Sequence, residues 1–286
     1  MLKTSDIGNI FREGHSLVDH LPYAEHWEGI FLNVDGSVGQ VWELDLPGCE
    51  GAEALRLDEF SAGISGLVAR IPHGLHVQMI VWSDGDVAPF LKAYRSVAEQ
   101  GMDRIVERIM DEKIRHILTH RDDGPVEVRS RRLRVFLTLR SFPSWSSGTG
   151  YPGDWARVKA EFLRVCSMVE GQLQALQIIF SVLDGPGLTF LLYRWLNPRR
   201  SRLIPEPVIS RELIREQVLY HAPVAHGRGF ILDGYHMRVL SLKELPQQTG
   251  PGMFAPLGAL FDSHQDMMLA FNFVVPDQDE AVSRLK

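Results

Sequence analysis

One predicted helix carries side chains that are suited to bind a metal ion. Glu112, His116 and His120 are spaced four residues apart, so a helix would place all three on one face. Carboxylate and imidazole groups are common zinc ligands, but the H-E-x-x-H motif of zinc hydrolases is absent. We therefore interpret these residues as the solvated end of a helix, where the helix dipole favours a histidine. The sequence assigns no metal ligand.

Two pairs of aspartates have the close spacing of paired acid and base catalysts. Asp84 and Asp86 precede one predicted helix, and Asp277 and Asp279 precede another. Because aspartate is favoured immediately before the first turn of a helix, we interpret both pairs as helix caps rather than catalysts. The G-x-S-x-G motif of serine hydrolases is also absent. We predict no catalytic residue and no cofactor-binding residue in this chain.

Two arginine clusters are the strongest candidates for a binding function. Guanidinium groups at either place could bind phosphates, acidic headgroups or an acidic partner. The first cluster alternates along a predicted strand, which favours the solvent-exposed face of that strand. The second lies in a loop after Asn197-Pro198, where we expect contact with another protein. The first cluster is Arg129, Arg131, Arg132 and Arg134, and the second is Arg199, Arg200 and Arg202.

Two of the six tryptophans are candidates for a protein interface. Trp145 and Trp155 lie in or beside residues 144–154, a segment rich in serine, glycine and proline that we predict to be a loop. Aromatic side chains are enriched at protein interfaces, so we expect one of these two rings to be exposed there. The other tryptophans are predicted to pack in the core.

The composition bounds the class of protein. With 286 residues, 45% hydrophobic residues and 23% charged residues, the chain has the composition of a soluble globular protein. Its formal net charge of -6 argues against unspecific binding of nucleic acid. Cys49 and Cys166 lie far apart, which indicates buried thiols in a reducing compartment rather than a disulfide or zinc framework. Acidic residues interrupt the N-terminal segment, and no apolar run reaches the ~20 residues of a membrane-spanning helix.

Two predicted β-hairpins must organise the fold. Asp35-Gly36 and Asp233-Gly234 each lie between runs of strand-forming residues, F-L-N-V-D-G-S-V-G-Q-V-W-E-L and G-F-I-L-D-G-Y-H-M-R-V-L-S-L. Asp-Gly at this position is typical of a hairpin with a type I′ turn. A helix, a strand, an acidic cap and a further helix follow each hairpin in the same order. Aligning the two turns places Trp42 on Leu240, which suggests a duplicated unit.

Amphipathic helices and further strands are expected between and after these hairpins. Helices are predicted for residues 58–71 with Asp58 as the N-cap, 90–118 with a kink or break at Gly101, 155–180 and 188–196. Strands are predicted for residues 76–82, 133–139 and 267–275. We interpret residues 184–189 as a break in the chain and residues 199–207 as a linker-like loop.

The fold class that we expect is α+β. Two mixed or antiparallel sheet units would form a pseudo-repeat of hairpin, helix, strand and helix, packed with long amphipathic helices. The predicted domains are an N-terminal arm at residues 1–28, a first unit at 29–183, a helix and linker at 184–210, and a second unit at 211–286. Because the second unit stops within its last predicted helix, we expect the chain to be a fragment of a longer protein.

Three segments resemble the N-terminal region of the conjugative-transfer ATPases of type IV secretion systems, particularly the F-type TraC-like branch. They are the L-P-Y sequence at residues 21–23 before the first hairpin, the L-L-Y-R-W-L-N-P run at residues 191–198, and G-F-I-L-D-G-Y-H-M-R-V-L-S-L-K-E-L-P at residues 229–246. The resemblance covers most of residues 20–280.

This resemblance implies a large cytoplasmic bacterial ATPase that drives pilus assembly and DNA transfer. In such a protein an α+β N-terminal domain docks on the inner-membrane complex, protomers self-associate, and a C-terminal RecA-like domain uses ATP and Mg²⁺. The chain departs from the pattern, because the G-x-x-x-x-G-K-[ST] string that cradles nucleotide phosphates is absent. We therefore expect no ATP hydrolysis by this chain, no direct binding of nucleic acid and only peripheral contact with the membrane.

An assembly domain is thus the leading hypothesis for function, and two other classes stay open. One is a small-molecule or nucleotide-dependent enzyme on a duplicated α+β scaffold with no recognisable motif. The other is a phosphate-binding module that uses the arginine clusters.

Overall fold

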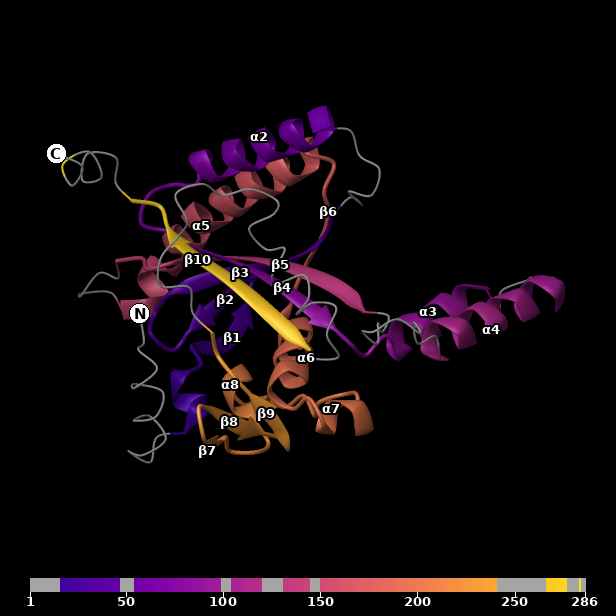
Figure 1. Ribbon diagram of the computed structural model, residues 1–286. Helices are drawn as coiled ribbons and strands as arrows, with labels where there is room; N and C mark the ends of the chain where they lie inside the picture. Colours follow the sequence, from indigo (N-terminus) through magenta and orange to yellow (C-terminus); the bar gives the residue numbers. More distant parts are fainter. Residues whose placement is uncertain are drawn as a thin grey trace. The chain divides into compact units, whose positions relative to one another are not determined.

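The computed structural model describes residues 16–46, 54–98, 104–119, 131–144, 150–240, 266–276 and 283. These residues form helices and two β-sheets, which confirms the predicted α+β class (Figure 1). The chain divides into two compact units. Unit 1 comprises Met1–Met79, Phe136–Ser241 and Asn272–Lys286, and unit 2 comprises Ile80–Val135 and Leu242–Phe271. The predicted domains are segments that would fold independently. The structure does not test independent folding, so these boundaries stay predictions.

The larger sheet contains the first predicted hairpin. Its seven strands in the described part of the chain are β1 (Tyr23–Trp27), β2 (Ile30–Asn33), β3 (Val38–Asp45), β4 (His76–Asp84), β5 (Arg132–Ser141), β6 (Ile179–Val182) and β10 (Met267–Val274). The order is β1-β2-β3-β5-β4-β10, with β6 as a further neighbour of β3. The start of β3 pairs antiparallel with β2, and its end pairs antiparallel with β6, where Trp42 lies opposite Val182.

The described end of the N-terminal arm predicted for residues 1–28 forms regular structure. Residues Leu17–His20 form a short 3-10 helix, η1, whose first turn is capped by the side chain of Ser16. β1 then pairs antiparallel with β2, with Trp27 opposite Ile30. The Leu21-Pro22 pair ends the helix but does not prevent the following residues from adding a strand to the sheet.

Two helices of unit 1 pack side by side, as Figure 1 shows for α2 (Ala54–Arg70) and α5 (Gly150–Ala175). Buried side chains recur every three or four residues along α5, so one stripe of this helix faces the core. The indole nitrogen of the fully buried Trp42 on β3 donates a hydrogen bond of 3.0 Å to Glu170 on α5. The stripe consists of Val158, Phe162, Cys166, Val169 and Leu173.

The ends of these two helices differ from the prediction. α2 begins at Ala54, so Asp58 lies within the helix and is not its N-cap. The four residues before Asp58 are strong helix formers, which explains the earlier start. α5 begins at Gly150 and ends at Ala175, whereas residues 155–180 were predicted. The end moves because Gln177 adopts a φ of 58° and the β-forming residues after it pair with β3.

The buried thiol of α5 provides a test of the core. Burial raises the pKa of Cys166 to about 12, and the Glu170 carboxylate adds to the rise. Because the thiolate is the reactive form, we expect no reaction with a disulfide reagent at pH 8 in a Cys49→Ser chain until denaturant is added. Above the ordinary pKa of 9.0, the unfolded thiol loses its proton first, so stability should fall as the pH rises towards 12. Rapid labelling of the native chain would contradict this packing.

In unit 2 the single long helix predicted for residues 90–118 is two helices, α3 (Ala88–Ala98) and α4 (Arg104–Thr119). The helices lie beside one another (Figure 1), and Arg95 on α3 pairs with Asp111 on α4 at 3.2 Å. Leu91 and Met110 are buried, one from each helix. Gly101, where a kink or break was predicted, lies outside the described residues, and the described residues on its two sides belong to different helices.

The second predicted hairpin lies in a small three-stranded sheet of unit 1. Its strands are β7 (Val224–His226), β8 (Gly229–Leu232) and β9 (Tyr235–Met237), paired antiparallel in that order. Asp233 and Gly234 have φ angles of 49° and 83°. Positive φ at both central residues is the requirement of a type I′ turn, so this prediction is confirmed.

The first hairpin closes with a different turn. Of its two predicted turn residues only Gly36 has a positive φ, 79°, and its amide donates to the carbonyl of Asn33 at 3.0 Å. The amide of Asn33 donates to the carbonyl of Ser37 at 2.9 Å. This is a three-residue loop with a glycine bulge, so the predicted type I′ turn is wrong here. Asp35 instead accepts hydrogen bonds from Ser37 and forms an ion pair with Arg140.

The two hairpins also lie in different surroundings. β9 ends at Met237, and Leu240, which aligns with the fully buried Trp42, is 82% exposed. β10 is a neighbour of β4 in the larger sheet and does not join the sheet of the second hairpin. Within the described residues, the similarity between the halves is therefore limited to the two turn sequences.

Candidate functional site

The second arginine cluster follows a helix, α6 (Gly185–Leu196), whose ends are set by its sequence. Asp184 is the N-cap and accepts a hydrogen bond of 2.8 Å from the amide of Gly187, with a proline in the first turn. Asn197 is the C-cap, and the following proline prevents the helix from continuing. The predicted break at residues 184–189 is therefore wrong, because this segment is the cap and first turn of α6.

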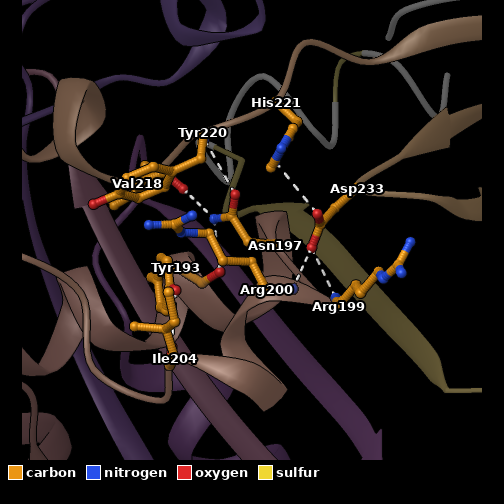
Figure 2. Close-up of polar contacts among 9 residues, drawn as sticks. All are labelled: Tyr193, Asn197, Arg199, Arg200, Ile204, Val218, Tyr220, His221 and Asp233. Carbon is orange, nitrogen blue, oxygen red and sulfur yellow. Dashed lines mark hydrogen bonds and ion pairs between the residues drawn. The ribbon is translucent and has the colours of Figure 1, made fainter.

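Asn197 joins the end of α6 to the segment at residues 218–220 (Figure 2). Its side chain is fully buried, and its Nδ2 donates to the carbonyls of Tyr193 at 2.9 Å and Val218 at 2.7 Å. Its Oδ1 accepts a hydrogen bond of 3.1 Å from the amide of Tyr220. A buried amide side chain with both its donor and acceptor groups satisfied contributes to stability and fixes the geometry around it.

Asp233, in the type I′ turn of the second hairpin, makes a second connection to the same region. Its side chain is 6% exposed, and its Oδ2 accepts hydrogen bonds from the amides of Arg199 at 2.8 Å and Arg200 at 2.6 Å. Its Oδ1 lies 3.3 Å from Nδ1 of His221 (Figure 2). The carboxylate therefore ties the hairpin to the start of α7 (Arg200–Leu203). We call Asn197 and Asp233 together the clamp.

Two tyrosine rings lie beside Asn197 and Arg200 (Figure 2). The Tyr193 and Tyr220 rings meet edge to face at 5.6 Å, and the Arg200 guanidinium lies 4.3 Å above the Tyr220 ring. The Tyr193 hydroxyl donates to the carbonyl of Ile204 at 2.9 Å. Burial raises the pKa of this hydroxyl, while Arg200 opposes the rise. The tyrosine therefore stays a neutral donor at physiological pH.

The clamp fixes a surface of basic and aliphatic side chains. Arg199 and Arg202 are exposed, and Arg202 lies over the Tyr235 ring at 5.6 Å. After them come four large aliphatic side chains with much of their surface in solvent. We call residues 199–209 the ridge. The aliphatic residues of the ridge are Leu203, Ile204, Val208 and Ile209, with exposed fractions of 75%, 47%, 72% and 55%.

α7 corrects part of the prediction that residues 199–207 are a linker-like loop, whereas residues 204–207 belong to no helix or strand. The three predicted arginines, Arg199, Arg200 and Arg202, lie together at and in α7, held by backbone bonds to Asp233 and by tyrosine rings. Arg200 is only half-buried on Tyr220, whereas Arg199 and Arg202 present their side chains to solvent. Their role as an interface stays a prediction.

The first arginine cluster is not a uniform solvent-exposed face. In unit 2 the Arg131 side chain is largely buried and pairs with Asp266 at 3.5 Å. Arg132 lies over the Phe90 ring at 5.2 Å, and Arg134 lies over the Trp82 ring at 5.3 Å. Arg129 lies outside the described residues. The interpretation as a wet strand face is therefore wrong for Arg131, because this residue forms a partly buried ion pair.

Of the predicted aspartate pairs, the structure describes one. Asp84 is buried at the end of β4, and its Oδ1 accepts a hydrogen bond of 3.0 Å from the amide of Asp86. α3 begins two residues after Asp86. Asp84 therefore belongs to the strand and to the turn that follows it. Asp277 and Asp279 lie outside the described residues.

Of the two tryptophans predicted as interface candidates, Trp155 is not the exposed one. This ring is buried and stacks on Trp27 with centroids 4.9 Å apart. Its indole nitrogen donates to Glu28 at 3.0 Å, and Lys159 pairs with the same carboxylate at 2.8 Å. The helix that begins at Gly150 carries the ring into the core, which a loop would not have done. Trp145 lies outside the described residues.

The Glu28 carboxylate makes the acid stability of the chain testable. Hydrogen bonds from Lys159 and Trp155 lower its pKa, so its contribution to stability is present above the ordinary value and is lost as the pH falls. We expect Glu28→Gln to remove part of the stability loss seen in urea unfolding below about pH 5. Glu161→Gln, an exposed glutamate on α5, is the control for loss of a charge. Identical pH profiles for Glu28→Gln and the unmodified chain would contradict the assignment.

The described residues contain no group of three or more histidine, cysteine, aspartate or glutamate side chains able to hold a metal ion. Glu112 and His116 are exposed on α4, and His120 lies outside the described part of the chain. No helix in the ranges that the structure describes is both long and apolar enough to cross a membrane.

Sequence reasoning missed the clamp. It read Asn197 only as a helix stop and Asp233 only as a turn residue. Both residues do fill these local roles, but their side chains also reach backbone groups far along the chain. One signal was available in the sequence. Asn197 lies directly before a segment with three arginines that was expected to be a loop, and a buried side chain at that position could have been predicted to hold the segment in place.

The fold and the clamp define an α+β scaffold domain that presents a fixed basic and aliphatic ridge. Residues 17–286 match the family described as TraC protein, so the chain belongs to the TraC family of F-type conjugative transfer proteins. No curated protein matches the chain. The chain therefore takes part in conjugative transfer by type IV secretion, and the resemblance carried by its three sequence segments is confirmed.

Proposed function

We propose that this chain is a non-catalytic assembly domain, the N-terminal part of a conjugation ATPase that docks on the inner-membrane complex of the secretion machine. ATP and Mg²⁺ would be used by a RecA-like domain elsewhere in the parent protein. The domain would lie on the cytoplasmic side, peripheral to the bacterial inner membrane. Contacts with other protomers would follow from assembly of the whole protein during pilus assembly and DNA transfer.

The observation that carries this proposal is the ridge. Four aliphatic side chains beside two exposed arginines are costly to leave in water, and contiguous exposed apolar surface commonly marks a binding site. The clamp keeps the segment ordered, so binding to it would lose little conformational entropy. A segment that served only to connect two elements would have no need of this buried hydrogen bonding.

The competing hypothesis is an enzyme whose site uses no familiar motif. Binding and turnover of ATP by the purified chain separates the two hypotheses. The proposal predicts that the chain neither binds ATP saturably nor hydrolyses it. Saturable ATP binding with turnover would contradict the assembly function and favour the enzyme.

Docking itself can be tested by competition in mating cells. Donor cells that contain an intact F-type transfer system would also produce this 286-residue chain from a separate plasmid. If the chain occupies docking positions of its parent protein, a tenfold excess should lower transfer frequency about tenfold by mass action. Unchanged transfer at that excess would contradict the proposal.

A further inference from the structure

The ridge is held in place at both ends of its aliphatic segment. At one end the carbonyl of Ile204 accepts a hydrogen bond of 2.9 Å from Tyr193, and at the other the amide of Ser210 donates to Gln217 at 2.8 Å. Pro205 and Pro207 lie between these two anchors. Because proline fixes its own φ and disfavours the helical region for the residue before it, the segment stays extended. Its exposed aliphatic side chains therefore occupy fixed positions.

The side chains of this segment are of an unusual kind for the centre of a protein interface. Such centres rely on tryptophan, tyrosine and arginine, whereas leucine and valine are under-represented among the residues that dominate binding. Residues 203–209 contain leucine, isoleucine and valine and no aromatic residue. Aliphatic side chains that project beside basic residues are instead typical of proteins that lie in the membrane interface.

The charges around the segment also fit a membrane surface. Arg199 and Arg202 precede the aliphatic residues, Arg211 follows them, and all three are exposed. Guanidinium groups bind phosphate oxygens in a bidentate manner, and each basic residue near an anionic bilayer contributes to binding. Glu206 is the one acidic residue of the ridge, and its charge opposes binding to an anionic surface. This local excess of positive charge occurs in a chain whose net charge is -6.

We propose that the ridge binds the surface of an anionic phospholipid bilayer. Arg199, Arg202 and Arg211 pair with lipid phosphates, while the aliphatic side chains enter the boundary between headgroups and acyl chains. This inference rests on the proposed function: docking through the ridge places the domain at the inner-membrane complex, and the ridge itself contacts the lipid beside that complex. Free phosphate and a second copy of the chain are the other occupants that the experiment separates.

Sedimentation with vesicles tests the electrostatic part. The chain should bind vesicles that contain phosphatidylglycerol and should bind pure phosphatidylcholine weakly, and added salt should weaken binding. Removing two arginine charges in R199Q/R202Q should weaken the affinity for phosphatidylglycerol vesicles about thirty-fold. R108Q, which removes an exposed arginine on α4, is the matched control and should bind as the unmodified chain does. Neutralising the opposing charge in Glu206→Gln should tighten binding.

Insertion of the aliphatic side chains is tested separately. Leu203→Ser with Ile209→Ser should weaken vesicle binding at least about tenfold, because two large apolar side chains no longer leave water. Ile179→Ser, which changes an equally exposed isoleucine on β6, is the matched control. Far-UV circular dichroism of each variant confirms that the fold is retained.

Each contrary outcome has a definite meaning. Absence of binding to phosphatidylglycerol vesicles overturns the inference. Displacement by millimolar inorganic phosphate with no effect of the serine variants indicates a phosphate site and also overturns it. If sedimentation equilibrium shows that the unmodified chain forms a dimer, and the ridge variants lose the dimer together with vesicle binding, the ridge contacts a second copy of the chain instead. If vesicle binding fails while competition in mating cells persists, only this inference falls; if competition fails while vesicle binding persists, the assembly function falls.

Discussion

Asn197→Ala is expected to lower the free energy of unfolding by about 3–4 kcal/mol, since buried polar groups that lose their partners each cost ~1–3 kcal/mol. The carbonyl of Val218 and the amide of Tyr220 would lose the side chain that they contact at 2.7 and 3.1 Å. The side chain is fully buried, so water cannot replace it without a rearrangement of the surroundings. α6 would also lose the cap that joins it to the segment before the small sheet.

Urea unfolding followed by tryptophan fluorescence measures this loss. Asn272→Ala is the matched control, because Asn272 is exposed on β10 and its side chain accepts a hydrogen bond of 2.6 Å from Gln78. We expect the control to change stability by less than about 1 kcal/mol. A loss below about 1 kcal/mol for Asn197→Ala would show that the junction between α6 and residues 218–220 does not depend on the buried amide.

Asp233→Ala is expected to cost about 3 kcal/mol, because two backbone amides lose a charged acceptor. These amides, of Arg199 and Arg200, lie 2.8 and 2.6 Å from the carboxylate. Alanine would also have to adopt the φ of 49° that this turn requires, which adds about 1 kcal/mol of strain. Asp233→Asn should be much milder, since asparagine tolerates this conformation and keeps one acceptor oxygen.

Hydrogen exchange of the Arg199 and Arg200 amides measures the loss of these two hydrogen bonds directly. In the unmodified chain and in Asp233→Asn these amides should be protected, and in Asp233→Ala their exchange should approach that of an unfolded peptide. Equal protection in all three proteins would show that the start of α7 is held by other contacts. The two variants together separate the loss of the hydrogen bonds from a general loss of the fold.

The sequence predicted most of the elements because their signals are local. Asp233-Gly234 specified a type I′ turn, and Pro198 specified the end of α6. Errors arose where tertiary contacts decided the outcome. Ile179 continued an apolar helical pattern, but pairing with Asp45 on β3 made it part of a strand.

The sheet order and the clamp lay beyond the reach of local patterns. Nothing in the sequence of β10 specifies that its neighbour is β4, because strand pairing depends on packing between segments far apart in the chain. Asn197 and Asp233 were each assigned a correct local role, but their backbone partners carry no side-chain signature that a sequence could reveal. The prediction from sequence identified the arginines as candidates because of their charge, but it assigned the aliphatic residues beside them to a loop.

The clamp holds the second arginine cluster in a fixed position, which the family assignment alone does not reveal. In a TraC protein of an F-type system, a rigid basic and aliphatic ridge is a feature that we expect to serve assembly. The hydrogen bonds that hold the ridge, with Tyr193, Gln217 and Asp233, all come from this chain.

The central claim, that the domain docks through its ridge, is tested most directly by transfer frequency in donor cells that overproduce variants of this chain. At equal production, R108Q should inhibit transfer as strongly as the unmodified chain, and R199Q/R202Q should inhibit weakly or not at all. Equal inhibition by the ridge variant and the control would contradict the account, because docking would then use another surface.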